Sequence, residues 1–164
     1  RQTRDPLVIN FGGTSAQLTS QRFKFDLNAD GKTESINFAT QGSGFLALDR
    51  NGDGKINDGS ELFGTQSGNG FADLALLDAD HNGWIDENDP AYEQLRIWTK
   101  NTSGNDLLST LKQANVGALG LAQTNTPFSL KDGNNDLLGQ VRASGIFLSE
   151  TGQVGSLQQI DLTV

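Results

Sequence analysis

Residues 78–89 carry the pattern that most constrains this chain. Oxygen-bearing side chains stand at positions 1, 3, 5, 9 and 12 of the twelve residues, with glycine at position 6. This alternation aims oxygens at one point, which suits Ca²⁺ better than Mg²⁺, because Mg²⁺ needs a strict octahedron and keeps its waters. The alternative is an ordinary turn of Asp and Asn residues that caps a helix. The expected ligands are Asp78, Asp80, Asn82, the Trp84 carbonyl, Asp86 and Asp89.

A second acidic loop begins at Asp49 and fits the first half of the same pattern. Its twelfth position is Ser60, and the next carboxylate, Glu61, arrives one residue late. Either the loop contains an extra residue, or Ser60 is passed over. Ile56 matches Ile85 at position 8, so we expect these two residues to join the loops through a short two-stranded contact. The expected ligands are Asp49, Asn51, Asp53, the Lys55 carbonyl and Glu61.

Residues 26–37 carry only the first half of the pattern and then continue into a predicted strand. The last position holds Asn37, a poor terminal ligand, so a calcium loop and a β-hairpin with an Asp-Gly turn are both open. Residues 132–136 are more typical of a plain turn. The sequence therefore predicts two calcium ions and leaves a third open. The ligands of that third ion are Asp26, Asn28, Asp30 and the Lys32 carbonyl.

The two ends of the chain show the patterns of strands. Apolar and polar residues alternate from Arg22 to Leu27, as in a half-buried strand. We expect further strands at residues 7–9, 36–38, 45–48, 118–121, 128–130, 140–142, 146–148 and 160–164.

The middle of the chain predicts short helices. Phe71 and Leu74 share one helical face, and Asn69 is suited to cap that helix. Pro90 favours the start of a second helix with apolar residues 91, 95 and 98, and residues 107–114 predict a third. A helix, a twelve-residue loop and a helix form an EF-hand-like unit.

These elements predict one α+β domain over residues 1–164, which is long enough for a hydrophobic core. We expect a β-rich part at residues 1–48, a central pair of EF-hand-like calcium loops with helices at 49–100, and a short helix followed by strands at 101–164. A chain that begins at Arg1 and contains no methionine is expected to be a fragment of a longer protein.

Composition excludes several classes of function. The net charge of −8 argues against nucleic acid and against insertion into or binding to an anionic membrane, because both need clustered Lys and Arg. The absence of cysteine excludes disulfides, zinc thiolate sites and cysteine nucleophiles. The single histidine, His81, lies inside an acidic loop. The sequence therefore offers almost no residues for a hydrolase that pairs a nucleophile with a histidine base.

Asp5-Pro6 is a chemically special dipeptide. The Asp side chain can attack its own peptide carbonyl to form a cyclic anhydride, and the proline nitrogen leaves more easily than an ordinary amide once it is protonated. The reaction requires a nearly neutral or well-placed carboxyl, which the surrounding structure must provide. The alternative is a plain extended entry into the first strand, because a residue before proline favours β geometry.

The ordered motifs of residues 5–100 resemble the calcium-triggered self-processing module of bacterial RTX proteins, which are exported by type I secretion. This resemblance implies that calcium triggers cleavage of Asp5-Pro6, and that the new Asp end can form an isopeptide bond with a lysine. This sequence departs from the family in one place: residues 10–14 contain no acid where the family usually has another acidic loop, so we expect a calcium site close to Asp5-Pro6 to be absent. The resemblance rests on residues 5–9, 25–31, 45–54, 59–64, 69–71 and 95–98.

We therefore expect a calcium-binding structural or interaction module of a larger secreted or cell-surface bacterial protein, whose folding is coupled to calcium. Autocatalytic cleavage at Asp5-Pro6, rather than the chemistry of a conventional hydrolase, is the alternative. A calcium sensor that opens a groove is disfavoured, because such sensors rely on methionine-rich surfaces and this chain has no methionine. The expected partners are calcium ions and another protein or the rest of the parent chain, with the domain itself monomeric.

Overall fold

Antiparallel strands make up most of this fold. The computed structural model describes residues 5–11, 18–39, 42–101 and 103–162. They form one sheet in the order β5-β8-β10-β11-β1-β4-β6-β7, with β9 also paired to β10, and a ribbon of β2 and β3. The strands are β1 Leu7–Asn10, β2 Leu18–Phe25, β3 Glu34–Ala39, β4 Ser43–Leu48, β5 Trp84–Ile85, β6 Leu95–Lys100, β7 Asp106–Thr110, β8 Val116–Gly120, β9 Thr124–Lys131, β10 Leu137–Ser149 and β11 Val154–Leu162. The helices are α1 Gly70–Ala75 and the 3-10 helices η1 Gly59–Glu61 and η2 Pro90–Glu93.

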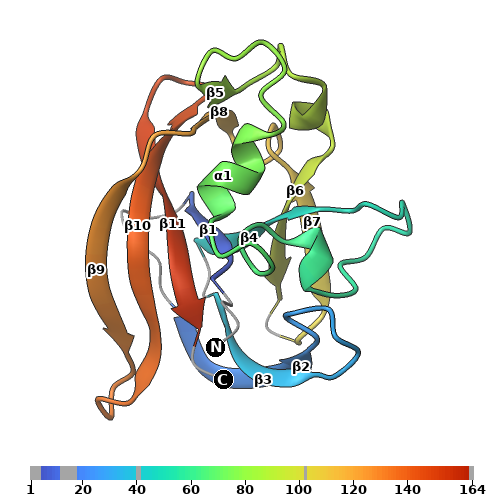
Figure 1. The fold of residues 1–164 in the computed structure, drawn as a ribbon. Coiled ribbons are helices and arrows are strands. Elements are labelled where there is room, and N and C mark those ends of the chain that lie inside the picture. Colours follow the sequence, from blue (N-terminus) through green and yellow to red (C-terminus); the bar gives the residue numbers. More distant parts are fainter. Residues whose placement is uncertain (1–4, 12–17, 40–41, 102, 163–164) are drawn as a thin grey trace.

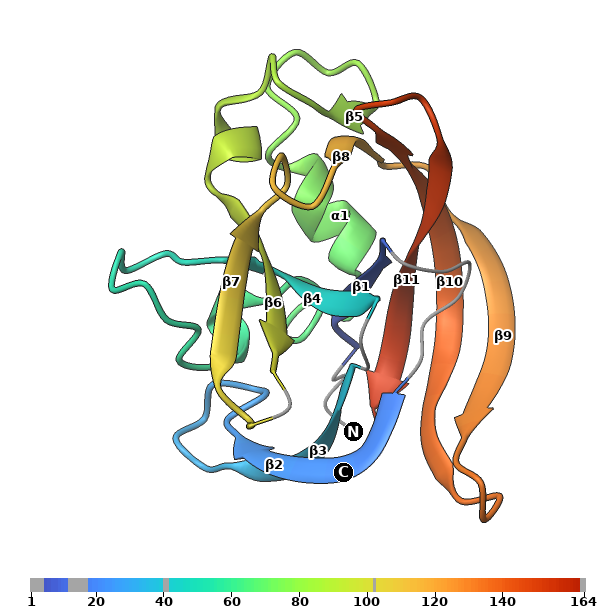
Figure 2. The same ribbon diagram turned by 180° about the vertical axis from the view of Figure 1, so that it is seen from behind.

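The large sheet curls around helix α1 (Figure 1). Strands β9, β10 and β11 stand on one side of the curl, β6 and β7 stand on the other, and β1 and β4 lie between them. The ribbon of β2 and β3 lies across one end of the curl, as the view from behind also shows (Figure 2). Such curling follows from the right-handed twist of long antiparallel strands.

Strand β1 joins the two ends of the chain. It pairs with β11 on one edge, where Leu7 lies opposite Gln159, and with β4 on the other, where Val8 lies opposite Phe45. The parts predicted at residues 1–48 and 101–164 therefore share one sheet instead of forming two. This pairing brings Asp5 and Pro6, the residues just before β1, to the side of β11.

Both faces of the central strands are buried, because successive residues of a strand point to opposite faces of the sheet. Phe45 of β4 belongs to a hydrophobic cluster that the β2–β3 ribbon covers, and its ring lies 5.9 Å from that of Trp98. Leu46, the next residue, belongs to a second cluster with Phe71 of α1. This double burial explains why residues 45–48 read as a continuous apolar run rather than as an alternation.

The prediction of an α+β domain with a central EF-hand-like pair is wrong. Among the described residues α1 is the only α-helix, and no helix–loop–helix pair forms. Residues 91–98 and 107–114, predicted as helices, lie mainly in η2, β6 and β7. Over so few residues the helical and buried-strand patterns coincide, and the run Ile97-Trp98-Thr99 is β-branched or aromatic, which favours a strand.

The strand predictions are confirmed in the part of the chain that the structure describes, although residues 140–142 and 146–148 belong to the single strand β10. The helix after Asn69 is also confirmed, and the Asn69 side chain accepts a hydrogen bond from the Ala72 amide at its start. Residues 163–164 of the last predicted strand lie outside the described residues. No described helix is long and apolar enough to cross a membrane.

Candidate functional site

The third acidic loop brings three carboxylates together. Oxygens of Asp78, Asp80 and Asp89 lie within 4.8 Å of one another, and this is the one such group among the described residues. Asp78 and Asp89 are buried, whereas Asp80 is exposed. A divalent cation would satisfy three acids in this arrangement, since Ca²⁺ takes carboxylate oxygens.

The carboxyls of this group influence one another. Burial opposes ionisation of Asp78, but the N–H groups of Gly83 and Asn82 outweigh it and hold its pKa below the usual range. Partial desolvation, and then the hydrogen bond with Asp78, raises the pKa of Asp80, although its side chain is exposed. Without a cation the pair therefore favours one shared proton, which a divalent ion would displace.

Asp89 closes the third loop with two backbone hydrogen bonds. Its Oδ1 accepts from the Ala79 amide at 2.7 Å, and its Oδ2 accepts from the Asp86 amide at 3.0 Å. These donors are the second and ninth residues of the loop. At the loop's start, Asp78 Oδ2 accepts from the Gly83 amide at 2.9 Å.

The second loop repeats this arrangement with Glu61 in the closing place. Glu61 is buried and accepts from the amides of Arg50 at 3.1 Å and Asn57 at 2.7 Å, again the second and ninth residues. Asp49 Oδ2 accepts from the Gly54 amide at 2.7 Å. The loop therefore contains an extra residue, which η1 accommodates before Glu61. Its acids do not gather as closely as those of the third loop.

The first loop closes through a residue that the sequence pattern missed. Asp26 accepts from the amides of Asp30 at 3.0 Å and Gly31 at 2.8 Å, and the Leu27 amide donates to Glu34 Oε2 at 2.9 Å. Glu34 stands at position 9, where a twelve-residue count does not look for the terminal acid. Glu34 is the sole acid between Gly31 and the predicted strand at 36–38, and this position is the sequence signal that could have identified it as the closing residue.

One local hydrogen bond recurs in all three loops and involves several of the remaining predicted ligands. The amide at position 7 donates at 2.9 Å to the side chain at position 5, so these loops differ in composition but not in this local turn. The pairs are Lys32 with Asp30, Lys55 with Asp53, and Trp84 with Asn82. The other predicted ligands lie in the same loops: Asn28 in the first, and Asn51, whose Nδ2 donates to Asn57 Oδ1, in the second.

The predicted contact between Ile56 and Ile85 is wrong. Ile85 lies in β5 and pairs with Leu119 of β8, while Ile56 belongs to the other hydrophobic cluster. The first and second loops are joined instead, through a 2.8 Å hydrogen bond from the Gly59 amide to the Asp26 carbonyl. Sheet pairing therefore separates the third loop from the other two.

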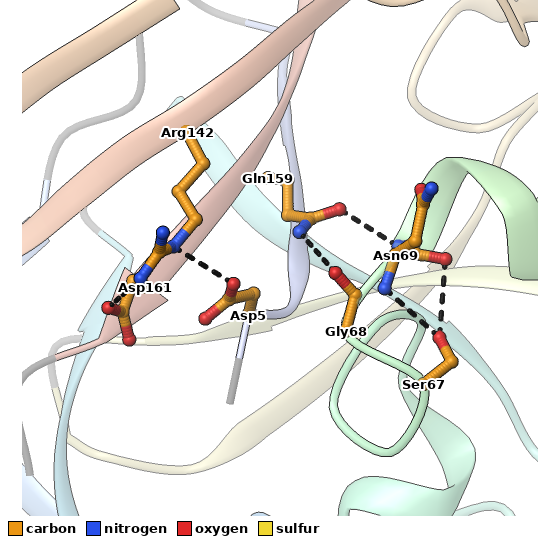
Figure 3. Close-up of polar contacts among 8 residues, drawn as sticks. Asp5, Ser67, Gly68, Asn69, Arg142, Gln159 and Asp161 are labelled. Atoms are coloured by element: carbon orange, nitrogen blue, oxygen red, sulfur yellow. Dashed lines mark hydrogen bonds and ion pairs between the residues drawn. The ribbon is translucent and has the colours of Figure 1, made fainter. Parts of the chain in front are cut away.

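Asp5 is buried beside two charged residues of the C-terminal strands. Its Oδ2 lies 3.0 Å from Arg142 Nε, and the same guanidinium donates to Asp161 Oδ2 at 2.7 Å (Figure 3). Only 2% of Asp5 and 9% of Asp161 is exposed. Burial first, and then the negative charge of Asp161, raises the pKa of Asp5, and Arg142 offsets part of this rise.

The peptide unit between Pro6 and Leu7, directly after the Asp5–Pro6 bond, is held from two sides. On one side the Ile160 amide of β11 donates to the Pro6 carbonyl at 3.0 Å. On the other, the Leu7 amide donates to the Phe63 carbonyl at 3.2 Å. Gln159 connects these sides, since it bonds to the Gly68 carbonyl and the Gly70 amide, each at 2.9 Å (Figure 3).

Sequence reasoning missed Arg142, Asp161 and Gln159, because only the register between β1 and β11 brings them to Asp5. The segment predicted to have lost an acidic loop begins with Asn10, which is buried and bonds to Ser43, Ser156 and Gln158 in the sheet. Residues 12–14 of that segment lie outside the described residues.

Comparison with known proteins shows the family of this chain and a curated relative. Residues 7–163 match the family described as SPM domain. A relative named iron-regulated protein FrpA, from Neisseria meningitidis serogroup C, is 28% identical over 146 residues, which cover 79% of this chain. The chain spans 13% of the length of that relative. The family match begins just after Asp5 and Pro6, so it does not include them, and any role for these two residues rests on the geometry alone.

Proposed function

The chain belongs to the SPM domain family, and on that premise we propose that calcium triggers cleavage of its own Asp5–Pro6 peptide bond. The observation that carries this proposal is the buried Asp5 carboxyl, whose raised pKa favours a protonated side chain directly before a proline. A neutral carboxyl supplies both the attacking oxygen and the proton that the proline nitrogen needs to leave.

The reaction balances without any external oxidant or cofactor. A side-chain oxygen of Asp5 bonds to the Asp5 carbonyl carbon, and the bond from that carbon to the Pro6 nitrogen breaks. The carboxyl proton passes to the nitrogen, which leaves as a secondary amine at the new N-terminus. Water then opens the cyclic anhydride and restores two carboxyl groups on Asp5, whereas a lysine amine that opens it would form the isopeptide bond.

Calcium would act through the segment that lies beside the reacting bond and binds the next peptide unit. Glu61 closes the second loop, and Phe63, two residues later, accepts the hydrogen bond from Leu7. The first loop supports the same segment through the bond between Gly59 and Asp26. Ions in these loops would therefore fix the backbone that faces the Asp5 carbonyl.

The test is incubation of the purified chain with millimolar calcium, followed by mass spectrometry. We expect a fragment that begins at Pro6, with none in the presence of chelator and none from Asp5→Asn. The Asp89–Pro90 bond is an internal control that stays intact, because Asp89 is occupied by two backbone amides of its loop. A parent chain that remains whole after long incubation overturns the proposal.

A second candidate function is a calcium-stabilised structural or interaction module that performs no chemistry. The group of Asp78, Asp80 and Asp89 favours it, because that group needs only an ion and a fold to stabilise. Under this proposal the parent protein is larger, and is secreted or displayed at the cell surface. An uncut chain whose unfolding temperature rises with calcium would support this second function over the first.

A further inference from the structure

The Asp5 carboxyl shares one guanidinium with a second carboxyl. Arg142 reaches from β10 to Asp5 through Nε and to Asp161 of β11 through its terminal nitrogen. Two buried carboxylates side by side repel each other, and this repulsion is costly away from water. One proton held by the pair removes that cost.

A second observation points to the same proton. Oδ1 of Asp5 is buried, and no N–H or O–H group of the described residues donates to it. Buried carboxyl oxygens are normally hydrogen-bonded, so an orphaned one calls for a donor. In Figure 3 the Arg142 guanidinium reaches the carboxyls of both Asp5 and Asp161, and a proton shared between these two carboxyls would supply that donor.

We propose that Arg142 and Asp161 are positioning residues for the cleavage, which rests on the proposed function. Arg142 fixes the orientation of the Asp5 carboxyl through Oδ2, and Asp161 keeps one proton shared between the two carboxyls. The shared proton fills the donor position at Oδ1 of Asp5, and it is available for the Pro6 nitrogen when the carboxyl attacks.

The charged groups around Asp5 are few in the part of the chain described. From β10 comes Arg142 and from β11 comes Asp161, and these two act directly on the Asp5 carboxyl. From α1, the nearest acid is Asp73, but its Oδ2 accepts from the Gly64 amide and the Ser67 hydroxyl. Burial contributes most to the raised pKa of Asp5, and Asp161 and Arg142 are the charged groups that act on it.

The experiment is the pH dependence of the cleavage rate at saturating calcium in the parent and in Asp161→Asn and Arg142→Gln. The rate falls as pH rises and the shared proton is lost. Asp161→Asn leaves Asp5 paired with Arg142 alone, so we expect this fall to move to lower pH by about one unit or more. Arg142→Gln removes the cation, so the fall moves to higher pH, and the maximal rate drops at least about tenfold.

Controls separate this role from simple support of the fold. Asp136→Asn, in the exposed turn after β9, should keep the parent's profile. If Arg142→Gln does not fold, Arg142→Lys replaces it, with a lower rate and an unmoved profile because the charge remains. Loss of rate in both Asp161→Asn and Arg142→Gln without opposite shifts of the profile overturns the inference.

A second readout distinguishes failure of this inference from failure of the proposed function. Carbon NMR of the Asp5 carboxyl in calcium-free, uncut chain follows its proton directly. Opposite shifts of that titration in Asp161→Asn and Arg142→Gln support the shared proton even if the parent never cuts, in which case the proposed function alone has failed. A titration unchanged by Asp161→Asn overturns the inference even if the parent cuts.

Discussion

Gly64 lies so close to Asp5 that a Cβ atom added to Gly64 would stand 2.3 Å from the Asp5 carbonyl oxygen. Gly64 also has φ of +91°, a backbone conformation that favours glycine. Its amide donates to Asp73 at 2.9 Å, which anchors this turn to α1. The Asp5 carbonyl, at which the proposed cleavage takes place, therefore packs against the backbone of Gly64, where no side chain fits.

Gly64→Ala is predicted to stop cleavage. The methyl group would displace the Asp5 carbonyl, and a misplacement of about 1 Å costs roughly a hundredfold in rate. The strained φ adds a loss of about 1–3 kcal/mol in the free energy of unfolding. Mass spectrometry gives the rate and thermal unfolding gives the stability. Gly133→Ala is the matched control, since a Cβ there meets nothing within 4 Å, and parent-like cleavage by Gly64→Ala would contradict the prediction.

Asp5→Asn is predicted to change how stability depends on pH. The folded protein keeps a proton on Asp5 that the unfolded chain releases above its ordinary pKa of 3.8. The free energy of unfolding of the parent therefore decreases as pH rises from there through the raised pKa of Asp5. Asparagine does not ionise, so the variant lacks this decrease and is the more stable chain near pH 7.

The measurement is the unfolding midpoint from pH 4 to pH 8, with chelator present so that the parent stays uncut. A gain of 1 kcal/mol raises the midpoint by roughly 2–4 °C in a chain of this size. Asp136→Asn, which changes an exposed carboxyl, should follow the parent. Curves for the parent and Asp5→Asn that stay parallel over the whole range would rule out a raised pKa.

The sequence predicted the strands well because their signal is local. Alternation over residues 22–27 and apolar runs such as 45–48 reflect side chains that each face a core directly. The helices predicted after Pro90 failed because burial on both faces of β6 gives Leu95 and Trp98 a spacing that a helix also explains. Distinguishing the two requires the pairing of β6 with β4, which is a property of the whole sheet.

The candidate site was predictable in part for the same reason. The aspartates of the three loops are close in sequence, so spacing alone found them. Glu34 and the closing role of Glu61 depend on how each loop returns to its own second residue, which a fixed count of twelve does not capture. Arg142 and Asp161 reach Asp5 across more than a hundred residues of chain, and only the strand register brings them there.

Calcium is predicted to stabilise the chain through Asp78. At a free ion concentration about 100 times the dissociation constant, binding adds about 2.7 kcal/mol to the free energy of unfolding. For a chain of this length that raises the unfolding midpoint by roughly 5–10 °C. Asp78→Asn keeps the shape of the side chain but removes a charge from the group with Asp80 and Asp89, so the part of this rise that the third loop contributes should disappear.

Thermal unfolding with calcium, magnesium or chelator checks this prediction. Asp132→Asn is the matched control, because Asp132 also accepts backbone amides within a turn but belongs to no group of acids. It should respond to calcium as the parent does, and magnesium should have the smaller effect throughout. An equal rise in Asp78→Asn and Asp132→Asn would show that the third loop does not hold the ion.

Glu61→Gln is predicted to raise the calcium concentration that cleavage requires. Both carboxylate oxygens of Glu61 accept backbone amides, from Arg50 and Asn57, and a glutamine amide has one acceptor for those two donors. The unsatisfied amide costs about 1–3 kcal/mol, and the second loop also loses a charge that attracts calcium. The calcium concentration for half-maximal cleavage should rise about tenfold or more, while the rate at saturating calcium stays near that of the parent.

Ser60→Ala is the control variant, because it changes the residue that a strict count of twelve makes the last ligand. It should leave the calcium dependence of cleavage unchanged. A larger shift in Ser60→Ala than in Glu61→Gln would mean that the loop closes at Ser60 when calcium binds.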